Sequence, residues 1–185
     1  MDIHTLIKNR WSPVAFSDQV IETDVIQSIF EAASWAPSAY NGQPWRFIWG
    51  MKGDESYTVL FDLLNEGNQV WAKTAPVLVL SIAETMFVDR GSKNKFAMHD
   101  TGMAVGNLLL QATHAGLFVH QMGGYDAEKA MEVFKLSEYQ IPMAVMAIGY
   151  KGDKKQLPEE VAKREDKKRE RKQVGEFVFN TSLSA

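Results

Sequence analysis

Cysteine is absent from the 185 residues of this chain. Its absence excludes disulfide bonds, thiolate nucleophiles, cysteine-ligated zinc and iron–sulfur clusters. Long apolar runs are missing as well. The longest extends from about Ala75 to Ala83, whereas a membrane-spanning helix needs about 20 apolar residues. The N-terminal segment is amphipathic and lacks the apolar stretch of a signal peptide. We therefore expect a cytoplasmic protein that does not bind membranes.

Several sequence motifs of catalysis are also missing. The chain has no Walker A sequence and no G-x-G-x-x-G, which argues against a P-loop or a standard Rossmann dinucleotide site. It has no G-x-S-x-G, which argues against a hydrolase of that type. The histidines share no metal-ligand spacing, so we expect no metal site; they are His4, His99, His114 and His120. An enzyme with this sequence would take its reactive group from a cofactor.

The chain has no excess of positive charge. Its 20 basic and 23 acidic residues give a net charge of −3, which argues against a nucleic-acid partner. Ten of the basic residues and six acidic ones lie between Lys151 and Lys172. A charge run of this kind is usually a solvated, extended or frayed helical segment. The apolar stretch from Val174 to Phe179 follows it, and we expect that stretch to pack against something.

The composition and periodicity predict one mixed helix-and-strand domain over residues 1–185. Hydrophobic residues make up 45% of the chain, enough for a packed core. Residues 54–64 fit either a helix or a strand. The remaining pattern predicts helices over 3–10, 23–36, 95–114 and 127–134 and strands over 45–49, 76–82, 117–121 and 143–150. Helices alternate with strands, so we expect an α/β or α+β fold with a sheet covered on both faces.

Three segments have the chemistry to hold an anionic cofactor. Arg10-Trp11-Ser12-Pro13 offers a guanidinium, a hydroxyl and backbone amides to a phosphate. The segment from Ala36 to Trp45 is rich in amides and turn residues, and Met122-Gly123-Gly124-Tyr125 allows a ring close to the backbone. Taken singly, each segment also fits an ordinary turn or a chance match.

The order of the motifs along the chain carries more information than each motif alone. The set comprises Arg10-Trp11-Ser12 with Phe16, Ala36 to Trp45, Gly67-Asn68-Gln69 before Ala75-Pro76, Met122 to Asp126, and Arg169-x-Arg171. This ordered set resembles the nitroreductase family of FMN-dependent oxidoreductases, from Ile3 to about Val178. The resemblance implies an α+β sandwich in which helices flank a central mixed sheet on both faces.

The resemblance assigns cofactor contacts residue by residue. It implies that the FMN phosphate binds Arg10, Trp11 and Ser12 together with the C-terminal pair Arg169 and Arg171, in a register where Lys172 can replace either arginine. Family members often carry a basic residue at the position of Val14, so one phosphate contact is lost here or supplied elsewhere. The residues that would contact the flavin ring are Asn68, Gly123 and Gly124 and, from the partner subunit, Pro37, Ser38, Ala39, Asn41 and Gln43.

The resemblance also implies an obligate homodimer in which residues 151–185 extend onto the partner. Gly102 and Gly106 lie four residues apart on the predicted long helix, which suits close approach of a helix from another chain. Tight packing within one chain explains the two glycines equally well.

The implied reaction is ping-pong transfer of hydride from NADH or NADPH through flavin N5 to a nitroaromatic, quinone or similar acceptor. No side chain is assigned as an acid, base or nucleophile. Tyr40, Trp71 and Phe87 are candidate walls of the substrate pocket, with a place in the core as the alternative. Other functions left open are a specialised relative of these enzymes, a flavin-storage or redox-sensing protein with little turnover, and a non-flavin interaction domain.

Overall fold

A four-stranded antiparallel sheet forms the centre of the computed structural model, which describes residues 2–180. The strand order is β1-β2-β6-β5, and the strands are β1 (Trp45–Met51), β2 (Val77–Glu84), β5 (Phe118–Met122) and β6 (Gln140–Gly149). Every neighbouring pair in this sheet is antiparallel. The prediction of a mixed sheet is therefore wrong for the described chain. Alternation of helices and strands suggests parallel neighbours in the sheet. Here the pairs β1–β2 and β5–β6 are antiparallel neighbours, and β2 and β5, which run in the same direction, are separated by β6.

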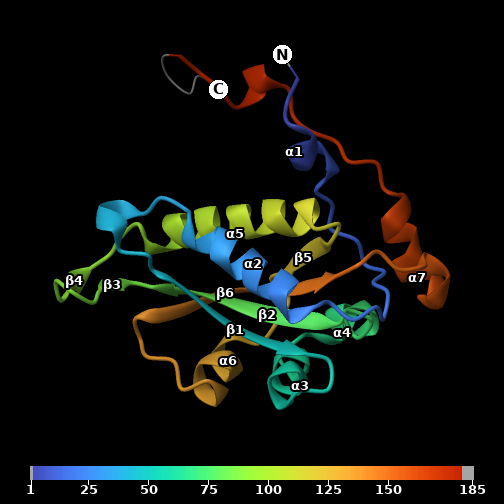
Figure 1. The fold of residues 1–185 in the computed structure, drawn as a ribbon, viewed down its shortest axis with the longest axis horizontal. Helices are drawn as coiled ribbons and strands as arrows, with labels where there is room; N and C mark the ends of the chain where they lie inside the picture. Colours follow the sequence, from blue (N-terminus) through green and yellow to red (C-terminus); the bar gives the residue numbers. More distant parts are fainter. Residues whose placement is uncertain (1, 181–185) are drawn as a thin grey trace.

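Helices cover both faces of the sheet, as the sequence predicts (Figure 1). One face carries α2 (Thr23–Ser34) and the long helix α5 (Ala97–His114), whose apolar sides form one core cluster with the sheet. The other face carries α3 (Glu55–Asp62), α4 (Glu66–Ala72) and α6 (Ala127–Val133), which enclose a second cluster. The α+β class is thereby confirmed.

Two helices differ from the sequence-based expectation. Residues 54–64, which fit either structure, contain α3, and its buried Tyr57 and Leu60 lie three residues apart on one helical face. Helix α4 was not predicted, because it has only seven residues and contains the helix-weakening Gly67. Its beginning is stabilised by Asn65, whose side chain accepts a hydrogen bond from the Asn68 amide.

Smaller elements surround the sheet and its helices (Figure 1). At the end that carries α4, the chain forms η2 (Lys154–Gln156), α7 (Glu159–Ala162) and η3 (Lys163–Asp166). Above α5, on the side away from the sheet, lie α1 (Thr5–Asn9) and η4 (Val174–Glu176). At the other end are the short helix η1 (Ala39–Asn41) and the hairpin of β3 (Met86–Phe87) and β4 (Ser92–Lys93). None of the helices in residues 2–180 is both long and apolar enough to cross a membrane.

Candidate cofactor-binding site

The C-terminal segment returns to the end of α1 and brings three arginines together. The Arg169 guanidinium donates hydrogen bonds to the backbone carbonyls of Lys8 and Arg10, and it lies 5.6 Å from the centroid of the Trp11 ring. Arg10 in turn donates to the Ser12 hydroxyl at 3.0 Å. Residues 159 positions apart in the sequence therefore form one basic group.

The electrostatics of this group favour an anion. Partial burial lowers the pKa of Arg10, and the positive charges of Arg169 and Arg171 lower it further. In the described part of the chain, none of these three guanidiniums forms an ion pair with a carboxylate. Uncompensated like charges at short range are unfavourable until an anion binds, and guanidiniums match the geometry of phosphate.

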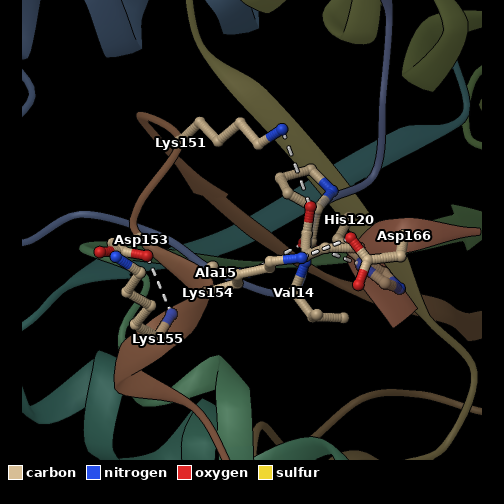
Figure 2. A network of polar contacts seen from close by, with 10 residues as sticks. Val14, Ala15, His120, Lys151, Asp153, Lys154, Lys155 and Asp166 are labelled. Atoms are coloured by element: carbon tan, nitrogen blue, oxygen red, sulfur yellow. Dashed lines mark hydrogen bonds and ion pairs between the residues drawn. The ribbon is translucent and has the colours of Figure 1, made fainter. Parts of the chain in front are cut away.

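The loop that follows Ser12 is fixed by a buried carboxylate from the C-terminal segment, that of Glu165. Figure 2 shows Val14 and Ala15 of this loop near His120 and Lys151. Glu165 Oε1 accepts hydrogen bonds from the backbone amides of Val14 and of Ala15, the second at 3.2 Å. The Glu165 side chain is only 6% exposed, and Lys151 Nζ lies 3.9 Å from its other oxygen. The amides of Val14 and Ala15 and the buried side chain of Val14 are thus unavailable to an anionic ligand.

His120 links this loop to the centre of the molecule. Its Nδ1 lies 2.8 Å from the Pro13 carbonyl oxygen, and because a carbonyl only accepts, we assign the hydrogen to Nδ1. The ring packs against Trp71 with 4.5 Å between centroids. Burial lowers the pKa of His120, and the hydrogen bond to Pro13 and the charge of Glu165 oppose that shift. The neutral imidazole therefore serves as a hydrogen-bonded spacer between β5 and the loop.

The second predicted group lies just beyond β5. The Asn68 side chain donates to the Gly124 carbonyl oxygen at 2.9 Å, and the Asn65 amide donates to the same oxygen at 3.1 Å. A Cβ atom on Gly124 would lie 2.4 Å from the Asn65 side-chain nitrogen, so any other residue there would displace the Asn65 side chain. Gly123 is exposed, with no atom within 4 Å of the place where its Cβ would be. An exposed glycine backbone beside an amide side chain suits a flat polar ring.

The third predicted group, residues 37–43, adopts a strained loop around η1. Tyr40, Asn41 and Gln43 all have positive φ, at 54°, 55° and 45°. Such backbone costs free energy and persists only where the surroundings enforce it. Here the buried Asp100 on α5 accepts a hydrogen bond from the Ala39 amide at 2.9 Å, and the Ser38 hydroxyl accepts one from the Gln43 amide at 3.0 Å.

This loop lies apart from the other two groups. Figure 1 shows η1 and the β3–β4 hairpin at one end of the molecule, and α4 and α1 at the other. Within one chain, the structure brings the arginine group into one region with Asn68 and Gly124, but it does not bring Pro37, Ser38, Ala39, Asn41 or Gln43 to them. The loop faces away from its own chain's basic group.

The three candidate pocket residues have different environments. Trp71 is 1% exposed and packs against Phe16 in the core, so it offers no surface to a substrate, and its assignment to a pocket wall is wrong. Phe87 is nearly buried, while Tyr40 is 72% exposed; their rings meet edge to face at 5.8 Å.

Sequence reasoning missed three supporting residues: Asp100, His120 and Glu165. Each acts on a partner at least 61 positions away along the chain. A single sequence contains no short-range pattern for such contacts. Only His120 had a sequence signal for a place near the site: it lies on the predicted strand 117–121, three residues before Gly123.

Comparison with protein families and named relatives gives a consistent result. The model of the nitroreductase family matches residues 7–59 and 51–150. An uncharacterised 15.4 kDa protein of Mycolicibacterium smegmatis is 33% identical over 142 residues, which cover 72% of this chain and 94% of that protein. A protein of Methanothermobacter thermautotrophicus, named provisionally as an NADH dehydrogenase/NAD(P)H nitroreductase, is 29% identical over 154 residues, 81% of this chain and 78% of that protein.

Solved structures share the same fold. The crystal structure of an oxidoreductase containing FMN superposes with a TM-score of 0.93 at 33% identity, covering 100% of this chain and 94% of that chain. A nitroreductase family protein from Clostridium difficile 630 superposes with a TM-score of 0.74 at 23% identity, covering 99% of this chain and 100% of that chain. The second likeness concerns the fold alone.

Proposed function

The chain belongs to the nitroreductase family, and from this membership we propose that it is an FMN-dependent oxidoreductase. In this proposal it oxidises NADH or NADPH and reduces nitroaromatic, quinone or similar electrophilic acceptors. The observation that carries the proposal is the junction of Arg10 with Arg169, because it builds an uncompensated cationic site from the two ends of the chain. The solved relative named as containing FMN supports the choice of cofactor.

The phosphate end of the site is assigned to Arg10, Ser12, Arg169 and Arg171. The hydroxyl of Ser12 is already oriented by Arg10, and Trp11 lies under the Arg169 guanidinium. These contacts limit the conformations of long side chains before the ligand arrives, which reduces the entropy cost of binding.

The ring end of the site is assigned to Asn68, Gly123 and Gly124. His120 connects the phosphate end of the site to the ring end. Its side chain contacts Pro13, next to Ser12, and it lies three positions before Gly123, a distance of roughly 10 Å along a strand. The chemistry that FMN supplies when bound is hydride uptake from NAD(P)H at flavin N5, followed by electron delivery to the acceptor in ping-pong order. A backbone amide of the exposed Gly123 that donates to the bound ring would favour the electron-rich reduced flavin.

The proposal includes a homodimer, because the loop of residues 37–43 cannot reach its own chain's arginine group. A Cβ atom at Gly102 or Gly106 on α5 would have no atom of residues 2–180 within 4 Å apart from the helix's own backbone, so tight packing within the described chain does not explain these glycines. Next to α5 is an open groove of about 590 Å³ whose lining includes Leu6, Trp35 and Leu110. We assign the groove to the partner's exposed apolar tail, of which Phe177 is 58% exposed.

The cofactor and the turnover are tested by separate measurements. We expect the purified protein to be yellow and to release FMN, at close to one per chain, on denaturation. Steady-state oxidation of NADH or NADPH with a quinone then distinguishes an enzyme from a flavin-storage protein. Turnover equal to that of free FMN would contradict the enzymatic proposal, and a colourless protein that takes up no added FMN would contradict the cofactor as well.

A further inference from the structure

The β3–β4 hairpin holds a cation over the aromatic ring of the strained loop. The Arg90 guanidinium carbon lies 4.3 Å from the centroid of the Tyr40 ring and 5.6 Å from that of Phe87. The planes of the two aromatic rings are inclined by 81°. One arginine and two aromatic rings thus form a single small surface that joins the hairpin to the loop of residues 37–43.

Tyr40 is held outward at a cost in backbone energy. Its φ of 54° is unusual for a residue with a side chain, yet the side chain is 72% exposed. Loop and hairpin are in close contact, because a Cβ on Gly42 would lie 2.9 Å from the Phe87 ring. Core packing does not offset the free-energy cost of this strained backbone, because the Tyr40 ring is exposed to solvent. Contact between the ring and a bound ligand does offset it.

Arg90 keeps hydrogen-bonding capacity toward such a ligand. Its Nε lies 3.5 Å from an Asp89 oxygen, with side chains 45% and 74% exposed. An ion pair this exposed is weak, and a guanidinium has five N–H donors. The aromatic faces fix the orientation of the guanidinium and leave donors for a second anion.

We propose that Tyr40 and Arg90 form a recognition site for an aromatic ligand that carries an anionic group, with the ring on Tyr40 and the anion on Arg90. The inference rests on the proposed function, in which this loop faces the flavin of the partner chain. Arg90 is then a specificity-determining residue for substrates. Two substrate sources have this chemistry: an acceptor that bears a carboxylate, and the 2′-phosphate of NADPH.

The experiment compares ligands that differ only in charge. Oxidised, FMN-loaded protein is titrated by calorimetry, without reductant, with para-nitrobenzoate and with its neutral counterpart para-nitrobenzamide. A second pair, NADP⁺ and NAD⁺, tests the phosphate. The variants are Arg90→Met, which keeps length without charge, and Arg90→Lys, which keeps the charge. The matched control is Lys95→Met, because Lys95 is a second cation over an aromatic ring, 5.1 Å from the Phe96 centroid.

We expect Arg90→Met to raise the dissociation constant of the anionic member of one pair about threefold to fivefold, as for an exposed charge pair. The member that lacks the extra anionic group, para-nitrobenzamide or NAD⁺, should bind as before. With Arg90→Lys and Lys95→Met, both members of each pair should bind as they do to the wild type. If Arg90→Met raises the dissociation constant of para-nitrobenzoate alone, Arg90 binds the carboxylate of the acceptor. If it raises that of NADP⁺ alone, Arg90 binds the 2′-phosphate of the reductant.

Equal changes for the members with and without the extra anionic group, or no change in either pair, would overturn the inference, because a merely structural role does not discriminate charge. Yellow protein with that result leaves the proposed function intact. Protein that cannot be loaded with FMN would overturn both.

Discussion

At the scale of single residues, Arg10 has the most direct role in the proposed cofactor site. The substitution Arg10→Ala removes the guanidinium that donates to Ser12 and that is close enough to Arg169 and Arg171 for their charges to lower its pKa. Hydrogen bonds to charged groups contribute about 1.5–3 kcal/mol, so we expect the FMN dissociation constant to rise on the order of tenfold to a hundredfold. Fluorescence titration of the apoprotein measures it. Lys129→Ala, an exposed change on α6, is the control, and equal affinities in all three proteins would contradict the phosphate assignment.

His120 gives a second residue-scale prediction, on pH. Burial lowers the pKa of His120 in the folded protein below its ordinary 6.5, so the unfolded chain takes up a proton first as the pH falls. Its contribution to the unfolding free energy is therefore complete above about pH 6.5 and decreases below it, by at most about 1.4 kcal/mol per pH unit.

The measurement is urea denaturation of wild type and of His120→Gln across this range. The wild type should lose stability more steeply than the variant below about pH 6.5. Parallel stability curves would show that the histidine is not buried in the neutral form.

Residues of the site were predictable where they form short motifs and not where they act across the sequence. Arg10 and Ser12 share one motif, and the structure places them in contact. Asn68 and Gly124 belong to two motifs in a known order, and they too are in contact. Glu165 has no motif: it lies in a charged run that looks solvated, and only the folded chain shows that its carboxylate is buried.

At the scale of elements, Glu165 fixes the C-terminal segment to the loop after α1. The substitution Glu165→Ala leaves the amides of Val14 and Ala15 without their acceptor, which costs about 1–3 kcal/mol for a buried unsatisfied group. Glu165→Gln should cost less, because it retains an accepting oxygen and Oε2 accepts no hydrogen bond in the wild type.

Urea denaturation measures the loss of stability, and limited proteolysis reports whether the segment detaches. Asp166→Asn is the neighbouring control, since Asp166 pairs only with exposed Lys154 and surface pairs contribute little. If Glu165→Ala is no less stable than Asp166→Asn, the segment is not anchored by this carboxylate.

Elements with strong periodicity were predictable, and those defined by tertiary contacts were not. Strand β2 is buried along almost its whole length, and its run of apolar residues predicts a buried strand. The direction of pairing is set by connections that local periodicity does not encode, which is why the sheet is antiparallel and not mixed. Helix α4 buries Trp71 through its packing on Phe16 and His120, a placement that the isolated tryptophan does not reveal.

At the scale of the whole molecule, the separation of the strained loop from the arginine group implies that one chain holds an incomplete site. The substitution Gly106→Leu tests this, because its Cβ atom would have no atom of residues 2–180 outside the backbone of α5 within 4 Å. We expect a stably folded protein whose dimer dissociates at higher concentration than the wild type, with weaker FMN retention. Analytical ultracentrifugation and thermal unfolding separate the two effects. A dimer as tight as the wild type would place the interface elsewhere.

The central claim, that this chain holds FMN as a hydride acceptor, is tested most directly by anaerobic titration with NADH and with NADPH while the visible spectrum is recorded. The account predicts a flavin spectrum that bleaches with one of these reductants at about one equivalent per bound FMN and returns when a quinone is added. A flavin that stays oxidised with both reductants would contradict the account.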